Sequence, residues 1–145
     1  DKRFTTIENN ALEIIEFIND KLDGSVLLIG GLSLGGQILL EILSHRKDIC
    51  KYAIVESALV IPSKFTYFMI KPLYSLKDGI EESEAIVHIF VGEKENHSMK
   101  KSAELIHRKL QNSSIQVLPN MYHGEFSINH ADDYVRRLLE IIEQR

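Results

Sequence analysis

Residues 31–35 form a Gly-x-Ser-x-Gly pattern, which can present Ser33 as a nucleophile. An apolar run precedes the pattern and a helical pattern follows it, which is the strand–turn–helix setting that such a nucleophile requires. The turn is so tight that we expect only residues without a Cβ atom to fit at Gly31 and Gly35. Ser33 would then stand at the N-terminus of a helix, where the Leu34 N–H can stabilise negative charge that develops on a substrate oxygen.

A serine hydroxyl needs a base within hydrogen-bonding reach, and that base needs a carboxylate to orient it. His123 is the predicted base, because it lies in a polar loop beside Gly124, directly after a strand-like run. The acid is expected between Ser33 and His123 in the chain. Glu95 follows an earlier apolar run and is the predicted acid, with Glu93 as a neighbouring alternative. The other histidines lie in or beside predicted helices, in mid-strand, or close behind the acid: His45, His88, His97, His107 and His130.

These residues need a scaffold, and the hydrophobic pattern predicts one. An opening helix is indicated by apolar residues at helical spacing between Ile7 and Leu22, with Thr5 and Glu8 as a capping box. Four apolar runs then alternate with helical patterns, giving strands at 25–29, 52–56, 86–91 and 115–118 and helices at 37–44, 98–110 and 131–142. Strands that are apolar throughout are typical of parallel sheets buried on both faces. The predicted class is α/β: a mostly parallel sheet of about four strands with helices on both faces.

The segment 57–85 interrupts this alternation, since it is rich in aromatic residues and has no clear period. It is predicted to be either a lid or substrate-lining element or an apolar satellite packed on the core. In the first case apolar side chains would line the place where the substrate binds, namely those of Leu32, Phe65, Phe68 and Met69. Residues 1–145 are interpreted as one domain.

The three polar loops together resemble those of the α/β-hydrolases, in particular the esterase, lipase and thioesterase branch. Residues 31–36 look like the family's nucleophile elbow, 92–95 like its Gly-x-x-Asp acid loop, and 121–125 like its histidine loop. The resemblance extends over the whole chain. It implies a Ser33, His123 and Glu95 triad that hydrolyses a carboxylic ester or thioester through an acyl-enzyme, with no metal or organic cofactor. The aromatic segment suggests a small-molecule substrate with an apolar acyl group.

The sequence departs from the family pattern at the acid position and upstream of the elbow. Aspartate is usual where this chain has Glu95, and Glu56 is a further alternative because some lipases of the family take their acid from the preceding strand. The family's sheet begins with several strands before the elbow, and its second oxyanion donor comes from a loop among them, whereas one helix precedes the elbow here. The chain therefore resembles the C-terminal half of such a fold, in which only the last helix covers one face of the sheet. We expect upstream residues or a partner chain to complete the sheet at the exposed apolar edge of the elbow strand.

Composition argues against several other classes of protein. A net charge of −4, from 17 basic and 21 acidic residues without long runs, does not favour binding to nucleic acid. The apolar stretches fall far short of the roughly 20 residues that span a bilayer. The single cysteine, Cys50, is predicted to be a buried thiol in a protein of the reducing cytoplasm.

Two alternatives to an active hydrolase come from other functional classes. A nucleotide-binding module is disfavoured, because the glycines do not fit Gly-x-Gly-x-x-Gly and Gln37 stands where a P-loop would continue with Gly-Lys-Ser/Thr. The stronger alternative is a catalytically incomplete hydrolase-fold fragment that serves binding or assembly.

Overall fold

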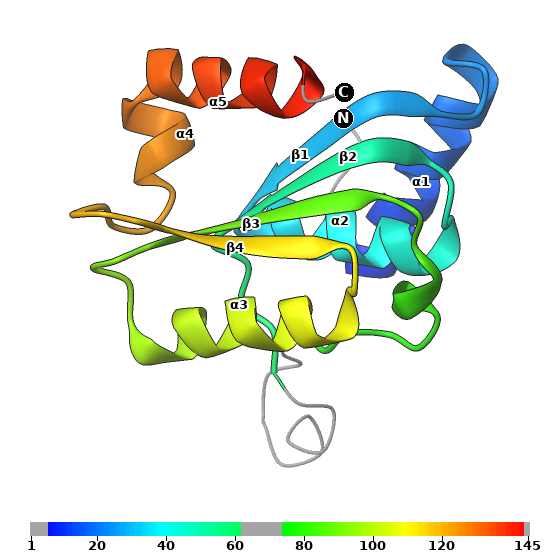
Figure 1. The fold of residues 1–145 in the computed structure, drawn as a ribbon. Helices are drawn as coiled ribbons and strands as arrows, with labels where there is room; N and C mark the ends of the chain where they lie inside the picture. Colours follow the sequence, from blue (N-terminus) through cyan, green and yellow to red (C-terminus); the bar gives the residue numbers. More distant parts are fainter. Residues whose placement is uncertain (1–5, 62–73, 144–145) are drawn as a thin grey trace.

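The chain forms one sheet between two layers of helices, in a computed structural model that describes residues 6–61 and 74–143 (Figure 1). In chain order the elements are α1 (Ile7–Lys21), β1 (Val26–Leu32), α2 (Leu34–His45), β2 (Cys50–Glu56), the 3-10 helix η2 (Ile80–Glu82), β3 (Ile86–Gly92), α3 (His97–Lys109), β4 (Ser113–Leu118), α4 (Glu125–Asn129) and α5 (Ala131–Glu143). The strands lie in the order β1-β2-β3-β4 and all pair in parallel. The predicted α/β class and its parallel four-stranded sheet are confirmed.

The sheet has an apolar core on each face. Helices α1, α2 and α3 cover one face, and α4 and α5 cover the other (Figure 1). Strand β2 shows why the central runs are apolar throughout: Ala53 and Val55 point into the first core, while Tyr52 and Ile54 point into the second.

The prediction that only the last helix covers the second face is wrong, because α4 lies on that face as well. Helix α4 has five residues, which is too short for a helical period to be recognised in the sequence. It is anchored by Phe126, whose ring lies 5.5 Å from that of Phe90 and 5.4 Å from that of Tyr134, both edge to face. Since α4 begins directly after His123 and Gly124, this aromatic contact also fixes the histidine loop.

Helix α1 begins one residue later than the capping pattern predicted. The N-cap is Thr6, whose hydroxyl accepts a hydrogen bond from the Asn9 N–H at 3.0 Å. The described N-cap is therefore Thr6 and not the predicted Thr5, and the predicted pairing of Thr5 with Glu8 lies outside the described residues.

Strand β1 has a strand partner on one side only within the described part of the chain. Its register runs from Val26 opposite Cys50 to Leu32 opposite Glu56, and the other edge is open. Leu27, in this strand, is 51% exposed. The elbow strand is therefore the apolar edge that the sequence predicted.

The single cysteine is buried, as the sequence predicted. Cys50 is buried, and this burial raises the pKa of its thiol to about 11, so a reactive thiolate is scarce at neutral pH. None of the described helices has the length and apolar character needed to cross a bilayer.

His88, in the middle of β3, makes folding stability depend on pH. Burial, and secondarily the positive charge of Arg137, lower the pKa of His88 in the folded protein. Near pH 6 the unfolded chain then binds more protons than the folded protein. The contribution of neutral His88 to folding stability is therefore complete above the pKa that His88 has in the unfolded chain, and it is lost as the pH falls. We expect the free energy of unfolding to decline between pH 7.5 and 5.5, by at most about 1.4 kcal/mol per pH unit from this group.

Urea unfolding at a series of pH values, compared between the wild type and His88→Gln, checks this expectation. His107→Gln, which replaces an exposed histidine on α3, is the control variant. The expectation is wrong if His88→Gln shows the same decline as the wild type.

Candidate active site

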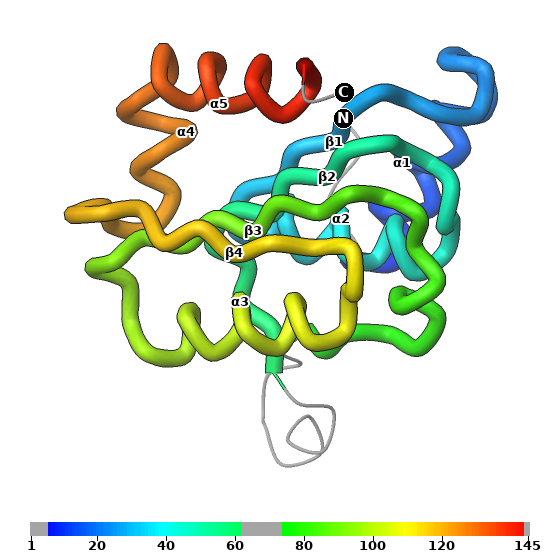
Figure 2. Tube along the Cα trace, in the orientation of Figure 1, coloured from blue at the N-terminus to red at the C-terminus, as the bar shows by residue number. Residues whose placement is uncertain are grey.

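The turns that follow the strands gather at one end of the sheet (Figure 2). Because parallel strands present their carboxyl ends at the same edge, the loops after β1, β2, β3 and β4 meet there. Ser33, Glu95 and His123 lie in three of these loops. The predicted site residues are thus brought to one edge by the sheet topology.

Ser33 occupies the junction of β1 and α2 in a strained conformation. Its φ of 54° and ψ of −113° are rare for a residue with a side chain. Two backbone hydrogen bonds hold it there, because its N–H donates to the Glu56 carbonyl at 2.8 Å and its carbonyl accepts from the Gln37 N–H at 3.1 Å. Its side chain does not cap α2, so the hydroxyl is not used by the helix that it precedes.

The glycines around Ser33 are crowded, although not in the way the motif predicts. A Cβ atom at Gly31 would overlap the backbone carbonyl of Gly35, so Gly31 is required. At Gly35 itself a Cβ would meet nothing within 4 Å, so the prediction that Gly35 must lack a Cβ atom is wrong. The second crowded position is Gly36, where a Cβ would lie 2.8 Å from the Cβ of Ala58. Gly36 lets the first turn of α2 approach the segment after β2.

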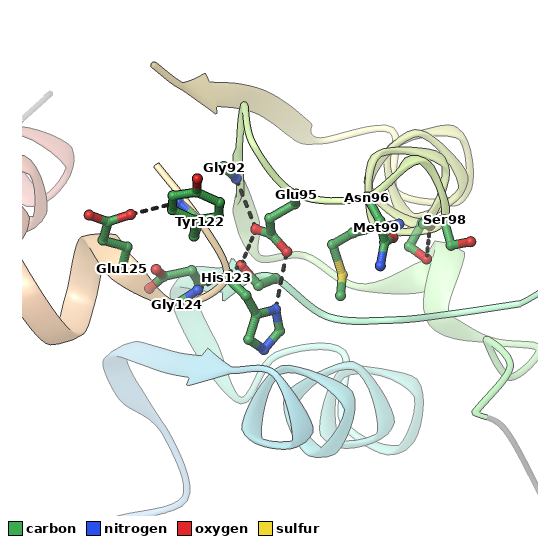
Figure 3. A network of polar contacts seen from close by, with 12 residues as sticks. Gly92, Glu95, Asn96, Ser98, Met99, Tyr122, His123, Gly124 and Glu125 are labelled. Carbon is green, nitrogen blue, oxygen red and sulfur yellow. Dashed lines mark hydrogen bonds and ion pairs between the residues drawn. The ribbon is translucent and has the colours of Figure 1, made fainter. Parts of the chain in front are cut away.

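Glu95 lies in the turn after β3 with its carboxylate almost entirely buried. The side chain is 2% exposed. One oxygen, Oε1, accepts hydrogen bonds from the Ser57 hydroxyl at 2.5 Å and the Gly92 N–H at 2.9 Å. The other oxygen, Oε2, lies 3.1 Å from Nδ1 of His123. Figure 3 shows the Glu95 carboxylate between Gly92 and His123, with dashed lines to both.

The two alternative acids contact other groups. Glu93 accepts a hydrogen bond from the Asn120 N–H at 2.8 Å. Glu56 is buried, and its Oε1 accepts from the Ser127 N–H at 3.3 Å. Within the described residues, Glu95 is the carboxylate that hydrogen bonds to His123.

His123 stands in the loop after β4, with its side chain 49% exposed. This loop and the acid loop pack backbone to backbone: the Lys94 N–H donates to the Met121 carbonyl at 2.9 Å, and a Cβ atom at Gly92 would overlap that carbonyl. Gly124, with a φ of 66°, turns the chain from His123 into α4. The close packing of the two loops keeps the imidazole over Glu95.

The histidine loop also touches the elbow. A Cβ atom at Gly124 would lie 3.0 Å from the Leu32 side chain, so the residues next to His123 and Ser33 are in contact. Figure 3 shows the second ring nitrogen of His123 pointing away from Glu95, toward the ribbon of β1 and α2. Within the described residues, no hydrogen bond joins the Ser33 hydroxyl to His123. The Leu34 N–H, in the first turn of α2, lies at the end of the helix where anions are favoured.

The predicted lining residues are only partly described. Leu32 packs against Gly124, whereas Phe65, Phe68 and Met69 lie outside the described residues. The described ends of the predicted insertion pack against the rest of the fold. The Gln37 side chain donates a hydrogen bond to the Leu59 carbonyl at 2.7 Å. Five residues of the insertion belong to the core under α2 and α3, namely Ala58, Val60, Tyr74, Ile80 and Ala85.

One group of side chains outside this edge has the spacing of metal ligands among the described residues. The ligand atoms of Glu8, Glu41 and His45, on α1 and α2, lie within 4.8 Å of one another. His45 Nε2 is 3.3 Å from Glu41 and 3.9 Å from Glu8. The hydrogen bond between His45 Nε2 and Glu41 Oε1 gives the buried Glu41 carboxylate a partner, and this contact accounts for the group.

Sequence comparison gives no relative, since no protein-family model and no curated protein matches the chain. Solved structures do match. An α/β-hydrolase enzyme from the metagenome of sediments from the lagoon of Mar Chica, Morocco, gives a TM-score of 0.78 at 18% identity, over 99% of this chain and 72% of that one. A serine hydrolase involved in carbazole degradation gives 0.77 at 12% identity, over 100% and 75%. A meta-cleavage product hydrolase from Pseudomonas fluorescens IP01 gives 0.73 at 11% identity, over 97% and 73%.

These similarities concern the fold. The chain has a partial α/β-hydrolase fold, and its sheet and helices correspond to those of esterases and other hydrolases. Since one fold hosts many reactions, the reaction has to be argued from the site itself.

Proposed function

We propose that the chain is a serine hydrolase that cleaves a carboxylic ester or thioester through an acyl-enzyme. The observation that supports this most is the buried Glu95 carboxylate hydrogen-bonded to His123 at the same sheet edge as the strained Ser33. A serine held at a rare φ, at the same sheet edge as an imidazole–carboxylate pair, is typical of sites with an activated nucleophile.

The proposed reaction assigns a role to each of these residues. Glu95 holds the proton of His123 on Nδ1, so that the free nitrogen can accept the Ser33 proton as the hydroxyl attacks the substrate carbonyl. The Leu34 N–H and the α2 N-terminus stabilise the oxyanion. His123 then protonates the leaving alcohol or thiol, and the same nitrogen activates the water that releases the acid. The reaction as written uses only side chains, backbone and water.

The acyl group is proposed to be apolar. Leu32 directly precedes the nucleophile in the chain. Phe65, Phe68 and Met69 lie in the aromatic segment 57–85, which also contains the core residue Val60. Apolar side chains around a few polar groups are typical of sites that bind small apolar ligands.

Labelling with a fluorophosphonate probe, followed by peptide mass spectrometry, tests the nucleophile. We expect one adduct, on Ser33, that is lost in Ser33→Ala. The matched control is Ser25→Ala, which removes a hydroxyl before β1 at the opposite end of the strand. An adduct on another serine, or a folded chain that is not labelled, contradicts the proposal.

A second candidate function is supported by the open edge of β1, where Leu27 is exposed. An apolar edge strand is a template for pairing with another strand, so a fragment of this fold could serve binding or assembly. The test is fluorophosphonate labelling of Ser33 with and without a segment or chain that pairs with β1. If the folded chain is labelled only when that segment or chain is present, assembly completes the site.

A further inference from the structure

Ser57, directly after β2, contacts both the acid and the histidine loop. It is 3% exposed. Its hydroxyl donates to Glu95 Oε1 at 2.5 Å and accepts from the Gly124 N–H at 3.4 Å. Its own N–H donates to the Phe90 carbonyl at 2.9 Å. One small side chain therefore connects the loops after β2, β3 and β4.

Ser57 is one of the groups that hold the Glu95 carboxylate. Its Oε1 has two donors, Ser57 and Gly92, and its Oε2 faces His123. Without the Ser57 hydroxyl, Oε1 keeps a single donor, the Gly92 N–H, so one hydrogen bond instead of two holds the buried carboxylate on that side. Loss of the Ser57 hydroxyl would thus allow Oε2 to leave the His123 ring.

The backbone of Ser57 gives an independent indication that its hydroxyl is used. Its φ is 52°, in the left-handed region that favours glycine. A serine held in this conformation is strained, and such strain is typical of functional sites.

From these contacts we propose that Ser57 is a positioning residue, which fixes the Glu95–His123 pair by holding the carboxylate on one side and the Gly124 N–H on the other. The inference rests on the proposed function, since the pair is the acid and base of that reaction. Ser57 does not touch the reacting atoms; it acts through Glu95.

Two substitutions separate positioning from a structural role. Ser57→Ala removes the hydroxyl and keeps the strained backbone, whereas Ser57→Gly removes the hydroxyl and relieves the strain. The matched control is Ser102→Ala, because Ser102 is also buried and its hydroxyl bonds to the Val60 backbone rather than to Glu95 or Gly124.

The measurements are the rate of Ser33 labelling by a fluorophosphonate, the tautomer of the His123 ring by nitrogen NMR, and the thermal unfolding midpoint. We expect both Ser57 variants to label about 10- to 100-fold more slowly and to lose part of the Nδ1–H tautomer. Ser57→Gly should unfold at a higher temperature than Ser57→Ala. Ser102→Ala should keep the wild-type rate and tautomer.

A wild-type rate and tautomer in Ser57→Gly would overturn the inference, and so would an equal loss in Ser102→Ala. Failure of the proposed function gives a different result. In that case the wild type itself is not labelled, and the His123 tautomer still shows whether Ser57 fixes the pair.

Discussion

Glu95→Gln is expected to lower ester hydrolysis and fluorophosphonate labelling about 10⁴-fold, the size of the effect when the triad carboxylate of a serine protease becomes an amide. The reason is the tautomer of His123. The carboxylate oxygen 3.1 Å from Nδ1 accepts a hydrogen bond and keeps the proton on that nitrogen. An amide NH₂ in its place donates to Nδ1, moves the ring proton to the other nitrogen, and leaves Ser33 without a base.

The experiment compares this variant with Glu93→Gln in the same loop. Both substitutions remove one negative charge, and Glu93 accepts its hydrogen bond from the Asn120 N–H rather than from the imidazole. We expect Glu93→Gln to change the rate less than about tenfold, since its effect on the site is that of a distant charge. Equal losses in the two variants would show that charge, rather than the hydrogen bond to His123, explains the effect.

Glu56→Gln decides the remaining alternative for the acid. Glu56 is buried, and it contacts the N–H of Ser127 in α4. A loss of about 10⁴-fold in Glu56→Gln with a small loss in Glu95→Gln would assign the acid to β2 instead.

The fold could be predicted from the sequence because its signals are local. Apolar runs such as 86–91 and helical spacing such as 131–142 each lie within one element, and the structure has β3 at Ile86–Gly92 and α5 at Ala131–Glu143. The strand–turn–helix around Ser33 is local as well. Element order then restricts the topology, since helix-linked strands pair in parallel.

The contacts that shape the site could not be predicted, because they join distant residues. Ser57 is 38 residues from Glu95 and 67 from Gly124. In the sequence it is the first residue of an irregular segment, with no pattern to distinguish it from other loop serines. A positive φ at a non-glycine residue is likewise not visible in the sequence. Glu56 was a candidate acid because the sequence shows that it stands at the end of a strand. The sequence does not show that its side chain contacts the Ser127 N–H of α4 instead of His123, because that contact joins distant residues.

The motif predicted crowding at both Gly31 and Gly35, whereas the structure shows it only at Gly31 of these two. This difference leads to the second prediction with a large expected effect. Gly31→Ala is expected to destabilise the protein by at least about 3 kcal/mol, above the usual range for an added methyl group. The added Cβ atom would overlap the backbone carbonyl of Gly35 in the first turn of α2. A side chain can rotate away from a clash, but this carbonyl is held by the helix, so β1 and α2 would have to separate.

Gly35→Ala is the matched control, because it adds the same methyl group four residues away within the same motif. Its Cβ atom meets nothing within 4 Å, and alanine in place of glycine in a helix favours the helix by about 0.5–1 kcal/mol. We therefore expect Gly35→Ala to fold with wild-type or slightly higher stability and to keep fluorophosphonate labelling of Ser33.

Urea unfolding of the two variants measures the difference directly. Each variant adds one methyl group two residues from Ser33. A difference of at least about 3 kcal/mol between their free energies of unfolding therefore reflects the different surroundings of the two methyl groups. If Gly35→Ala proves as destabilising as Gly31→Ala, both glycines are needed for the backbone conformation of the turn, and the crowding between β1 and α2 is not what selects them. If Gly31→Ala alone unfolds the protein, the first glycine of the motif allows the close approach of strand and helix that places Ser33 at the sheet edge with Glu95 and His123.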